Sequence, residues 1–439
     1  LTRTLATVTL ALSGAVFTLP SFAAEPAAMQ HVAWSKNANI YEVNIRQYTK
    51  EGTFKAFAAH LPRLKKMGVD ILWLMPIQPI GEKNRKGTLG SYYAVRDYTA
   101  VNPEFGTLAD FKDLVKQAHA LGMHVLIDWV ANHTAFDNRW TVEHKDWYLL
   151  NEKGEIFPVT YTEGAEPEYW TDVTGLDYKN KALWKGMTDA MLYWVRETDI
   201  DGFRCDVAGK VPTPFWNQAR DALDSVKPVF MLAEADKPDL QEHAFDMSYG
   251  WDTKDLFKDI AKGKKDARAL KDFLAHPPKA YPPGAYRMRF TSNHDENSWA
   301  GSDVELYGPA FKAMAVLAAT LPGMPLIYGG QEAGLDKRIE FFEKDPIAWK
   351  NYGYAPFYAK LLKLKHDNPA LWNGQYGGDI EVLETGNDKV FAFLRKRDGN
   401  AVKVSVNLSN DAQKFAPAGG KPQSLAAWDY RIEAPASAR

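Results

Sequence analysis

The chain has 439 residues, of which 46% are hydrophobic, so it can form one large domain with a full core and a smaller unit beside it. The 53 Lys and Arg nearly balance the 55 Asp and Glu, and the absence of a basic run or a known nucleic-acid-binding motif argues against a nucleic-acid partner. Downstream of the first residues, no run of about 18 apolar residues suggests a membrane span.

The N-terminal segment, residues 1–24, has the pattern of a signal peptide. Arg3 precedes the apolar run at residues 5–12, and residues 21–24 include small residues suited to cleavage. We therefore expect a protein that is secreted or periplasmic. Its single cysteine, Cys205, cannot form an internal disulfide, so the exported fold would not depend on one.

From about residue 38 to residue 335, strand-like runs alternate with helical periodicity. Eight strands, mostly followed by helices, indicate a (β/α)₈ TIM barrel. Strands are predicted at residues 39–45, 69–75, 124–130, 200–206, 229–234, 245–249, 289–293 and 325–329, and helices at 54–67, 107–121, 181–198, 213–226 and 307–320.

Two segments depart from this alternation. Residues 134–178 are too long for a turn and predict a short inserted domain after strand 3. After about residue 366, short strands separated by Gly, Asn and Asp predict a C-terminal antiparallel β-sandwich domain. The expected organisation is a signal peptide at 1–24, a barrel at 25–365 and a β domain at 366–439.

Polar residues close four of the predicted strand regions: Asp128 to His133, Gly202 to Asp206, Leu232 to Glu234, and Asn293 to Asp295. In a parallel barrel these ends meet on one rim, which is where such barrels carry their chemistry. Three carboxylates gathered with an Arg and two His favour work on a sugar bond.

Arg204 and Asp206 are two residues apart, so both side chains leave the strand on the same face. We expect Arg204 to keep Asp206 ionised, because a nearby positive charge lowers the pKa of a carboxyl. An ionised, oriented Asp206 suits a nucleophile. The alternative is an ordinary buried ion pair.

Glu234 lies between Ala233 and Ala235, and these small apolar neighbours favour the protonated form that a general acid needs. On adjacent strands, Asp206 and Glu234 would lie roughly 5 Å apart, as in a retaining glycosidase. Asp295 would be a third acid that binds sugar hydroxyls and steadies the transition state.

The remaining polar residues receive supporting roles. His133 and His294 are predicted hydroxyl-binding donors, although a lone His is more often a satisfied structural residue. Asp128 is predicted to brace the loop that follows it. HExxH, EF-hand and Cys-rich metal patterns are absent, so no cofactor is required; Asn132 with loop carbonyls is retained as a candidate structural Ca²⁺ site.

These segments resemble, in order, the four motifs of the α-amylase superfamily, glycoside hydrolase family 13. Residues 93–98, 323–332 and 391–408 are also similar to the family's stretches at the sugar-stacking tyrosine, the eighth strand and the C-terminal β domain. The resemblance covers nearly all of the chain after the signal segment. It implies that Asp206 is the nucleophile, Glu234 the acid/base and Asp295 the stabiliser, with Tyr93, His133, Arg204 and His294 around the attacked glucose.

Two departures from the family pattern limit what the resemblance implies. Residues 207–210 read Val-Ala-Gly-Lys where many α-amylases have Ala-Ala-Lys-His, and residues 175–177 read Gly-Leu-Asp where a Pro-Asp-Leu segment is frequent. The first change leaves the leaving-sugar contacts and the linkage preference open. Both weaken the case for calcium.

The sequence therefore predicts a retaining α-amylase-type hydrolase acting mainly on α-1,4 bonds of starch or maltodextrins. Its partner would be an α-glucan or malto-oligosaccharide, and the protein would be a monomer with no membrane partner. The alternatives are a transglycosylase, a branching enzyme, an α-1,6- or cyclodextrin-acting member of the same family, and a non-catalytic maltodextrin-binding protein.

Overall fold

The computed structural model describes residues 29–161, 168–417 and 421–435. The predicted signal peptide, residues 1–24, lies outside the described residues. Within the described part of the chain, no helix is both long and apolar enough to cross a membrane.

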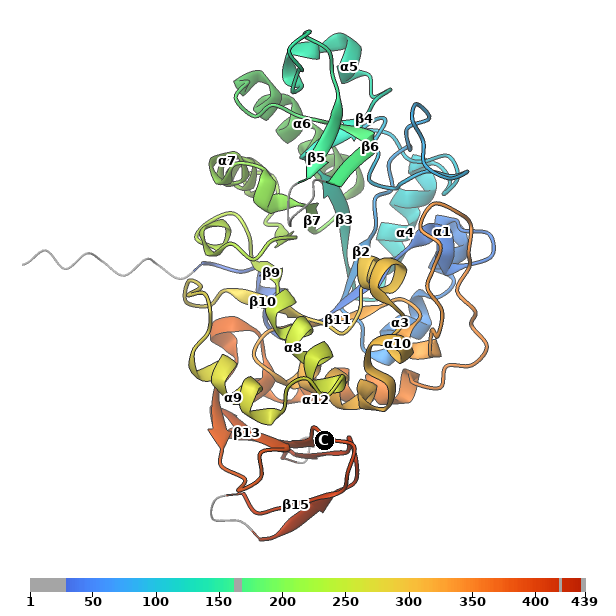
Figure 1. Ribbon diagram of the computed structural model, residues 1–439. Helices are drawn as coiled ribbons and strands as arrows, with labels where there is room; N and C mark the ends of the chain where they lie inside the picture. The colour runs from blue at the N-terminus through green and yellow to red at the C-terminus, as the bar shows by residue number, and fades with distance from the viewer. Residues whose placement is uncertain (1–28, 162–167, 418–420, 436–439) are drawn as a thin grey trace, which may run out of the picture.

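A closed barrel of eight parallel strands forms the centre of the molecule (Figure 1). Its strands pair in the order β1-β11-β10-β9-β8-β7-β3-β2 and back to β1. They are β1 (Ile40–Val43), β2 (Ile71–Leu74), β3 (His124–Val130), β7 (Gly202–Asp206), β8 (Phe230–Ala233), β9 (Met247–Tyr249), β10 (Tyr286–Arg289) and β11 (Met324–Tyr328). The predicted fold class is confirmed.

Helices surround the barrel, as amphipathic segments between buried parallel strands require. They are α1 (Ile45–Tyr48), α2 (Phe54–Ala58), α3 (Leu61–Met67), α4 (Leu108–Ala120), α6 (Lys181–Thr198), α7 (Thr213–Asp224), α8 (Trp251–Ala261), α9 (Ala267–Ala275), α10 (Asp303–Tyr307), α11 (Phe311–Thr320) and α12 (Ala355–Asp367). Local capping defines several ends: the Thr107 side chain and Asp110 form a reciprocal capping box at the start of α4.

Two predicted helices and one predicted strand differ from the structure. The helix predicted at 54–67 is interrupted before Leu61, because Pro62 has no N–H and sits in the first turn of a new helix, α3. The helix predicted at 307–320 is broken at Gly308-Pro309, so that only Phe311–Thr320 is α-helical there. Helices α8 and α9, between β9 and β10, were not predicted.

The third difference concerns the strand predicted at 289–293, which was placed too late. Strand β10 ends at Arg289. Its neighbour β9 ends at Tyr249 and is followed by helix α8 from Trp251, so β10 has no partner on this side beyond Met288. The residues Asn293, His294 and Asp295 therefore lie in the loop after the strand and do not close it.

The segment after β3 contains a small antiparallel sheet in the order β4-β6-β5. Its strands are β4 (His133–Ala135), β5 (Pro158–Tyr161) and β6 (Glu168–Gly175), with the short helix α5 (Trp140–Glu143) between the first two. It projects from one end of the barrel, at the top of Figure 1.

The C-terminal part forms two antiparallel sheets. Strands β12 (Asp379–Leu383), β13 (Val390–Arg397), β14 (Asn400–Asn407) and β17 (Tyr430–Glu433) make one, and β15 (Gln413–Phe415) and β16 (Gln423–Leu425) make the other. They lie below the barrel in Figure 1, next to α9 and α12. Arg395 of β13 joins the two parts, since it donates hydrogen bonds to the backbone oxygens of Thr320 and Trp372.

The barrel interior is filled by alternate residues of the strands, as a period of two requires. This inner cluster includes Ile71, Trp73, Leu126, Phe230, Leu232, Met247, Tyr249, Tyr286, Met288 and Met324, all fully buried. The same alternation continues toward the carboxyl ends, where Leu126 is followed two residues later by Asp128, and Leu232 by Glu234. The apolar core of the barrel thus lies directly beneath the polar residues of the rim.

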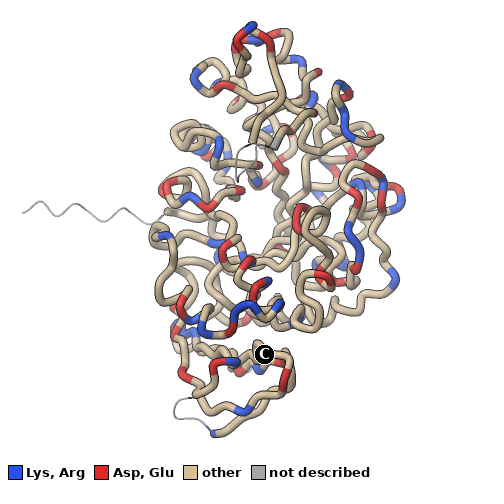
Figure 2. Tube along the Cα trace, in the orientation of Figure 1, with Lys and Arg blue, Asp and Glu red and all other residues tan. Residues whose placement is uncertain are grey.

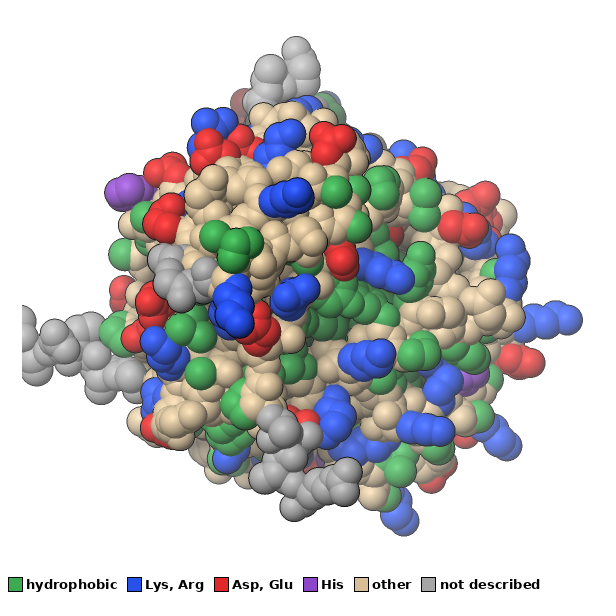
Figure 3. All heavy atoms as spheres, turned by 90° about the horizontal axis from the view of Figure 1, so that it is seen from below, with side chains coloured by type: hydrophobic (Ala, Val, Ile, Leu, Met, Phe, Trp, Pro, Cys, Tyr) green, Lys and Arg blue, Asp and Glu red, His purple; other side chains and the backbone are tan. Residues whose placement is uncertain are grey.

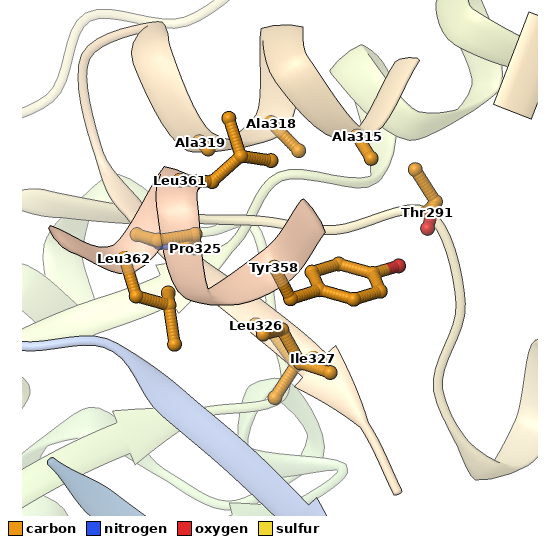
Figure 4. A pocket seen from close by; sticks show the side chains of 10 residues that line it. All are labelled: Thr291, Ala315, Ala318, Ala319, Pro325, Leu326, Ile327, Tyr358, Leu361 and Leu362. Carbon is orange, nitrogen blue, oxygen red and sulfur yellow. The ribbon is translucent and has the colours of Figure 1, made fainter. Parts of the chain in front are cut away.

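The surface carries charges of both signs along most of the chain (Figure 2), and the face shown in Figure 3 likewise mixes Lys and Arg with Asp and Glu. A small, mostly apolar cavity of about 10 Å³ lies between α11, α12 and β11 (Figure 4). This volume suits one water molecule, so the cavity cannot hold a sugar.

Candidate active site

Arg204 is the centre of the site at the carboxyl ends of the strands. Its side chain is fully buried, and its Nη1 atom lies 2.9 Å from Asp128 Oδ1 and 3.0 Å from Asp206 Oδ1. Its Nη2 atom lies 2.9 Å from Glu234 Oε2 as an ion pair, without the alignment of a hydrogen bond. One guanidinium therefore gathers three carboxylates from the neighbouring strands β3, β7 and β8.

The prediction that Arg204 keeps the pKa of Asp206 low is wrong for the free site. Burial, followed by the negative charge of Glu234, raises the pKa of Asp206 well above its usual range, and Arg204 only opposes this rise. The sequence showed the one favourable neighbour on the same strand but could not show the burial or the second carboxyl facing Asp206. In the free site Asp206 therefore keeps its proton to a higher pH than an exposed aspartate does.

Glu234 directly follows β8, and its Oε2 atom accepts a hydrogen bond of 2.7 Å from the backbone N–H of Val207. Val207 has φ +36°, a left-handed conformation that is costly for a β-branched residue. Strain of this kind collects at functional sites. Here it turns the backbone just after Asp206 so that the N–H of Val207 points at the neighbouring carboxyl.

Asp128 holds the floor of the site and does not brace the loop after it. Besides Arg204, it accepts hydrogen bonds from Trp73 Nε1 at 3.1 Å and from Tyr93 Oη at 3.0 Å. Asp128 lies within β3, two residues before the strand ends, so its side chain points into the barrel and not toward the loop. The loop-bracing prediction is therefore wrong.

Asp295 and His294 form the opposite wall, together with a glutamate that was not predicted. His294 Nδ1 lies 2.6 Å from Glu42 Oε1, and His294 Nε2 lies 3.3 Å from Asp295 Oδ2. Burial alone would lower the pKa of His294, but Asp295 and Glu42 raise it well above its ordinary value. His294 is therefore a cation at neutral pH, while the carboxyl of Asp295 remains 44% exposed and open to a ligand.

Tyr93 contacts both Asp128 and His294, which lie on different sides of the site. Its ring stacks on His294 with centroids 5.4 Å apart, and its hydroxyl lies 2.8 Å from His294 Nε2. The ring itself is 9% exposed, so only a small part of it faces the open rim.

His133 lies beside the nucleophile candidate, with Nε2 4.0 Å from Asp206 Oδ2. Burial lowers its pKa to about 4, so His133 is neutral at neutral pH. A neutral imidazole can donate a hydrogen bond to a sugar hydroxyl without adding a charge beside Asp206.

The structure thus brings together all seven residues predicted for the reacting end of the site and adds three that the sequence did not indicate. Glu42 pairs with His294, Trp73 bonds Asp128, and the Tyr249 hydroxyl accepts a hydrogen bond of 3.1 Å from Arg204 Nε. These three lie on strands β1, β2 and β9, whose other residues are mostly apolar. A Glu inside an apolar strand, as at position 42, is the one signal that could have been used.

The candidate calcium ligand, Asn132, is not surrounded by a suitable donor set. Its backbone oxygen accepts the N–H of Leu176, and its side-chain nitrogen lies 3.2 Å from His133 Nδ1. Asp172, on the nearby strand β6, pairs with Lys86 at 3.2 Å. Ca²⁺ needs six to eight oxygen ligands, and within the described ranges no group of three His, Cys, Asp or Glu is arranged to hold a metal ion. The described side chains around Asn132 thus give no support for the calcium site, which stays a prediction.

Comparison with known proteins agrees with this geometry. The protein-family model described as the α-amylase catalytic domain matches residues 33–360 of this chain. The chain is 28% identical over 421 residues to the α-amylase MalA of Haloarcula japonica, covering 91% of this chain and 59% of that protein. It is 29% identical over 443 residues to the α-1,4-glucan:maltose-1-phosphate maltosyltransferase of Rhodospirillum rubrum, with coverages of 91% and 60%. The chain spans about six tenths of the length of these curated relatives.

Two solved structures are similar to this chain over nearly their whole length. An α-amylase from Lactobacillus plantarum has a TM-score of 0.81 and 31% identity, over 91% of this chain and 99% of the other. The maltogenic α-amylase AmyB of Thermotoga neapolitana has a TM-score of 0.79 and 32% identity, over 91% and 97%. The barrel, the carboxylates gathered by Arg204 and the match over residues 33–360 place the chain in the α-amylase family of glycoside hydrolases.

Proposed function

We propose that the protein is a retaining hydrolase of α-glucosidic bonds, mainly α-1,4, in starch or maltodextrins. The observation that carries this proposal is the shared contact of Arg204, whose two terminal nitrogens lie 3.0 Å from Asp206 Oδ1 and 2.9 Å from Glu234 Oε2. The two carboxyls are in hydrogen-bond contact with each other, whereas an inverting enzyme keeps its carboxyls roughly 6.5–9.5 Å apart to admit a water.

In the proposed reaction, Glu234 donates its proton to the glycosidic oxygen as a carboxylate oxygen of Asp206 attacks C1. The C1–O bond to the leaving sugar breaks with its electron pair, and a β-linked glucosyl ester of Asp206 forms. Glu234 then takes a proton from water, whose oxygen attacks C1 and releases Asp206. Two inversions restore the α configuration.

The positions of the hydrogen bonds indicate which oxygen of Glu234 carries the proton. Oε2 accepts the Val207 N–H and faces the charged Arg204, so a proton there would oppose two donors. The acidic proton therefore belongs on Oε1. A proton on Oε1 can point at the glycosidic oxygen while Oε2 keeps its contacts with Val207 and Arg204.

The other residues bind the attacked sugar. Asp295 offers its exposed carboxyl to sugar hydroxyls and to the positive charge that develops at the anomeric carbon. The cationic His294 and the neutral His133 donate hydrogen bonds to hydroxyls, and Arg204 keeps the carboxylates fixed so that little reorganisation is needed during the reaction.

The test is the pair of substitutions Asp206→Asn and Glu234→Gln, each nearly isosteric. Either should lower hydrolysis of soluble starch by several orders of magnitude while the thermal unfolding midpoint stays within a few degrees of the wild type. Asp236→Asn, two residues beyond Glu234 at the surface, is the matched control. Starch hydrolysis at near-normal rates by Asp206→Asn would refute the assignment.

Transfer to a sugar acceptor is the second candidate, because the similar proteins include the maltosyltransferase of Rhodospirillum rubrum. The similar cyclomaltodextrinase of Geobacillus thermopakistaniensis makes cyclodextrin a further substrate to test. Chromatography of the products from maltoheptaose, pullulan and cyclodextrin separates the two activities. Products longer than the substrate indicate transfer, and only shorter ones indicate hydrolysis.

We also propose that the protein is exported, on the pattern of residues 1–24, and acts as a monomer. Fractionation of a host expressing the full chain should recover it outside the cytoplasm, and replacing the apolar run at residues 5–12 with polar residues should retain it inside. Light scattering of the purified protein tests the monomer.

A further inference from the structure

An exposed aromatic side chain lies directly beside the proposed transition-state stabiliser. Trp299 is 57% exposed, and all of the other tryptophans, every one of them within the described residues, are buried or half-buried. It lies in the single π-helical turn Glu296–Ala300, which immediately follows Asp295. Turns of this kind are frequent at functional sites, and burying an indole normally stabilises a fold, so its exposure at this position requires a reason.

The indole is held in place by other rings. Its ring centroid lies 5.4 Å from that of Phe341 and 5.9 Å from that of Phe342. Phe341 in turn lies nearly parallel to Tyr93, with centroids 6.2 Å apart and an interplanar angle of 13°. A row of aromatic rings therefore runs from Tyr93, at the proposed site of the attacked sugar, through Phe341 to Trp299 at the surface.

The turn that carries Trp299 is also fixed by polar contacts. The buried Asn297 donates to the backbone oxygen of Lys337 at 3.0 Å and accepts the N–H of Ile339 at 2.9 Å. Glu296 pairs with Lys254 at 2.5 Å, and its N–H bonds Asn293 Oδ1 at 2.8 Å. A ring on such a turn is pre-organised and loses little freedom when a ligand covers it.

We propose that Trp299 is a stacking platform for the glucose unit that adjoins the attacked one on the side away from the leaving group. This inference rests on the proposed function. Flat aromatic faces bind the apolar faces of sugar rings, and the exposed indole lies one step beyond Asp295, where the next ring of a bound chain would pass.

The barrel order decides the side. Glu234 must lie beside the leaving oxygen, and it is joined to the turn after β7 through the N–H of Val207. Glu234 follows β8, and Trp299 follows β10, two strands away; the indole packs on Phe341 of the loop after β11, three strands from β8 in the closed barrel. Because it packs toward β11, the ring lies on the side of the site away from Glu234.

Trp299 also acts on Asp295. Burial by itself would raise the pKa of Asp295, but the charges of His294 and Arg204 and a hydrogen bond from the Trp299 side chain lower it. The two roles of the indole are separable: a phenylalanine keeps the flat ring and removes the N–H, whereas an alanine removes both.

The binding test uses calorimetric titration with maltoheptaose of two proteins, Glu234→Gln and Glu234→Gln/Trp299→Ala. We expect about tenfold weaker binding in the double variant, which corresponds to about 1.4 kcal/mol. Tyr352→Ala in the Glu234→Gln background removes an exposed ring far along the loop and should bind as Glu234→Gln does. Equal affinities of the first two proteins overturn the inference, whereas failure of Glu234→Gln itself to bind maltoheptaose overturns the proposed function.

Kinetics on the active enzyme separates stacking from positioning. Trp299→Ala should raise KM for maltoheptaose about tenfold and change KM for maltotriose less, because the shorter chain fills fewer sites. Trp299→Phe should leave KM near the wild-type value and lower kcat two- to fivefold. If thermal unfolding shows that the alanine variant is misfolded, Trp299→Leu replaces it, with the same expected rise in KM. An unchanged KM in folded Trp299→Ala or Trp299→Leu contradicts the platform.

Discussion

His294 Nδ1 lies 2.6 Å from Oε1 of Glu42, and both side chains are almost completely removed from solvent. Glu42 belongs to β1 and His294 to the loop after β10, 252 residues later. The contact explains how a histidine can remain a cation in a buried position. It also means that the charge facing the sugar depends on a glutamate that does not touch it.

Replacement of Glu42 should therefore change the pH dependence of the reaction. The carboxylates Asp295 and Glu42 raise the pKa of His294 well above its ordinary value against the effect of burial. In Glu42→Gln one of these charges is lost, so the pKa of His294 falls and the cation disappears at a lower pH. We expect kcat/KM to fall about tenfold at pH 8 and much less at pH 5.5. Glu384→Gln, at an exposed position, is the control, and a pH profile of Glu42→Gln that parallels the wild type would contradict the coupling.

Asp128 should contribute strongly to the free energy of unfolding. Asp128→Ala removes the partner of Trp73 and Tyr93 and one of the charges that compensate buried Arg204. Breaking such a buried network costs about 3–5 kcal/mol. Urea unfolding measures the loss. Asp189→Ala, which breaks only an exposed pair, should change the free energy of unfolding by about 0.5 kcal/mol, and an equally small change in Asp128→Ala would disprove the structural role.

Asp303 gives a pH dependence of stability whose sign can be worked out. Its Oδ2 atom accepts a hydrogen bond from Gln331 at 2.8 Å, its Oδ1 atom has no partner, and burial raises its pKa to about 7. An acid whose folded pKa exceeds the unfolded value of about 4 stabilises the fold below that value, and the contribution disappears as the pH rises through 7. Asp303→Asn cannot ionise, so it should exceed the wild type in stability by about 2–4 kcal/mol at pH 8.5.

The same variant should show little advantage at pH 4, where the wild-type carboxyl is protonated in the folded state and about half protonated in the unfolded state. Thermal unfolding of the two proteins at both pH values is sufficient. A constant difference between Asp303→Asn and the wild type across this range would mean that Asp303 does not titrate near neutrality.

Chelators should leave the activity unchanged. The backbone oxygen of Asn132 accepts the N–H of Leu176 and its side-chain nitrogen lies beside His133, so we expect neither starch hydrolysis nor the unfolding temperature to respond to EDTA. Readdition of CaCl₂ completes the measurement. An unfolding temperature that drops with EDTA and recovers with Ca²⁺ would show that the loop binds the cation after all.

The site shows where local pattern is sufficient and where it is not. Arg204 and Asp206 were expected on one face because a strand has a period of two, and the structure places them 3.0 Å apart. The ionisation of Asp206 was wrongly expected, because the pKa of a carboxyl depends on burial and on Glu234, and neither is visible on the strand itself. Asp128 was misjudged for the same reason: its partners Trp73 and Tyr93 come from other parts of the chain.

The sequence alone determined the barrel, the order of its strands along the chain and the polar residues near their ends. Hydrophobic periodicity and the polar residues that follow each strand are local properties of a chain. The tertiary structure decided the raised pKa of Asp206, the cationic state of His294 through Glu42, the early end of β10 and the platform at Trp299. These depend on distances between segments far apart in the sequence and on the removal of water from charged groups, and both exist only after the barrel has closed.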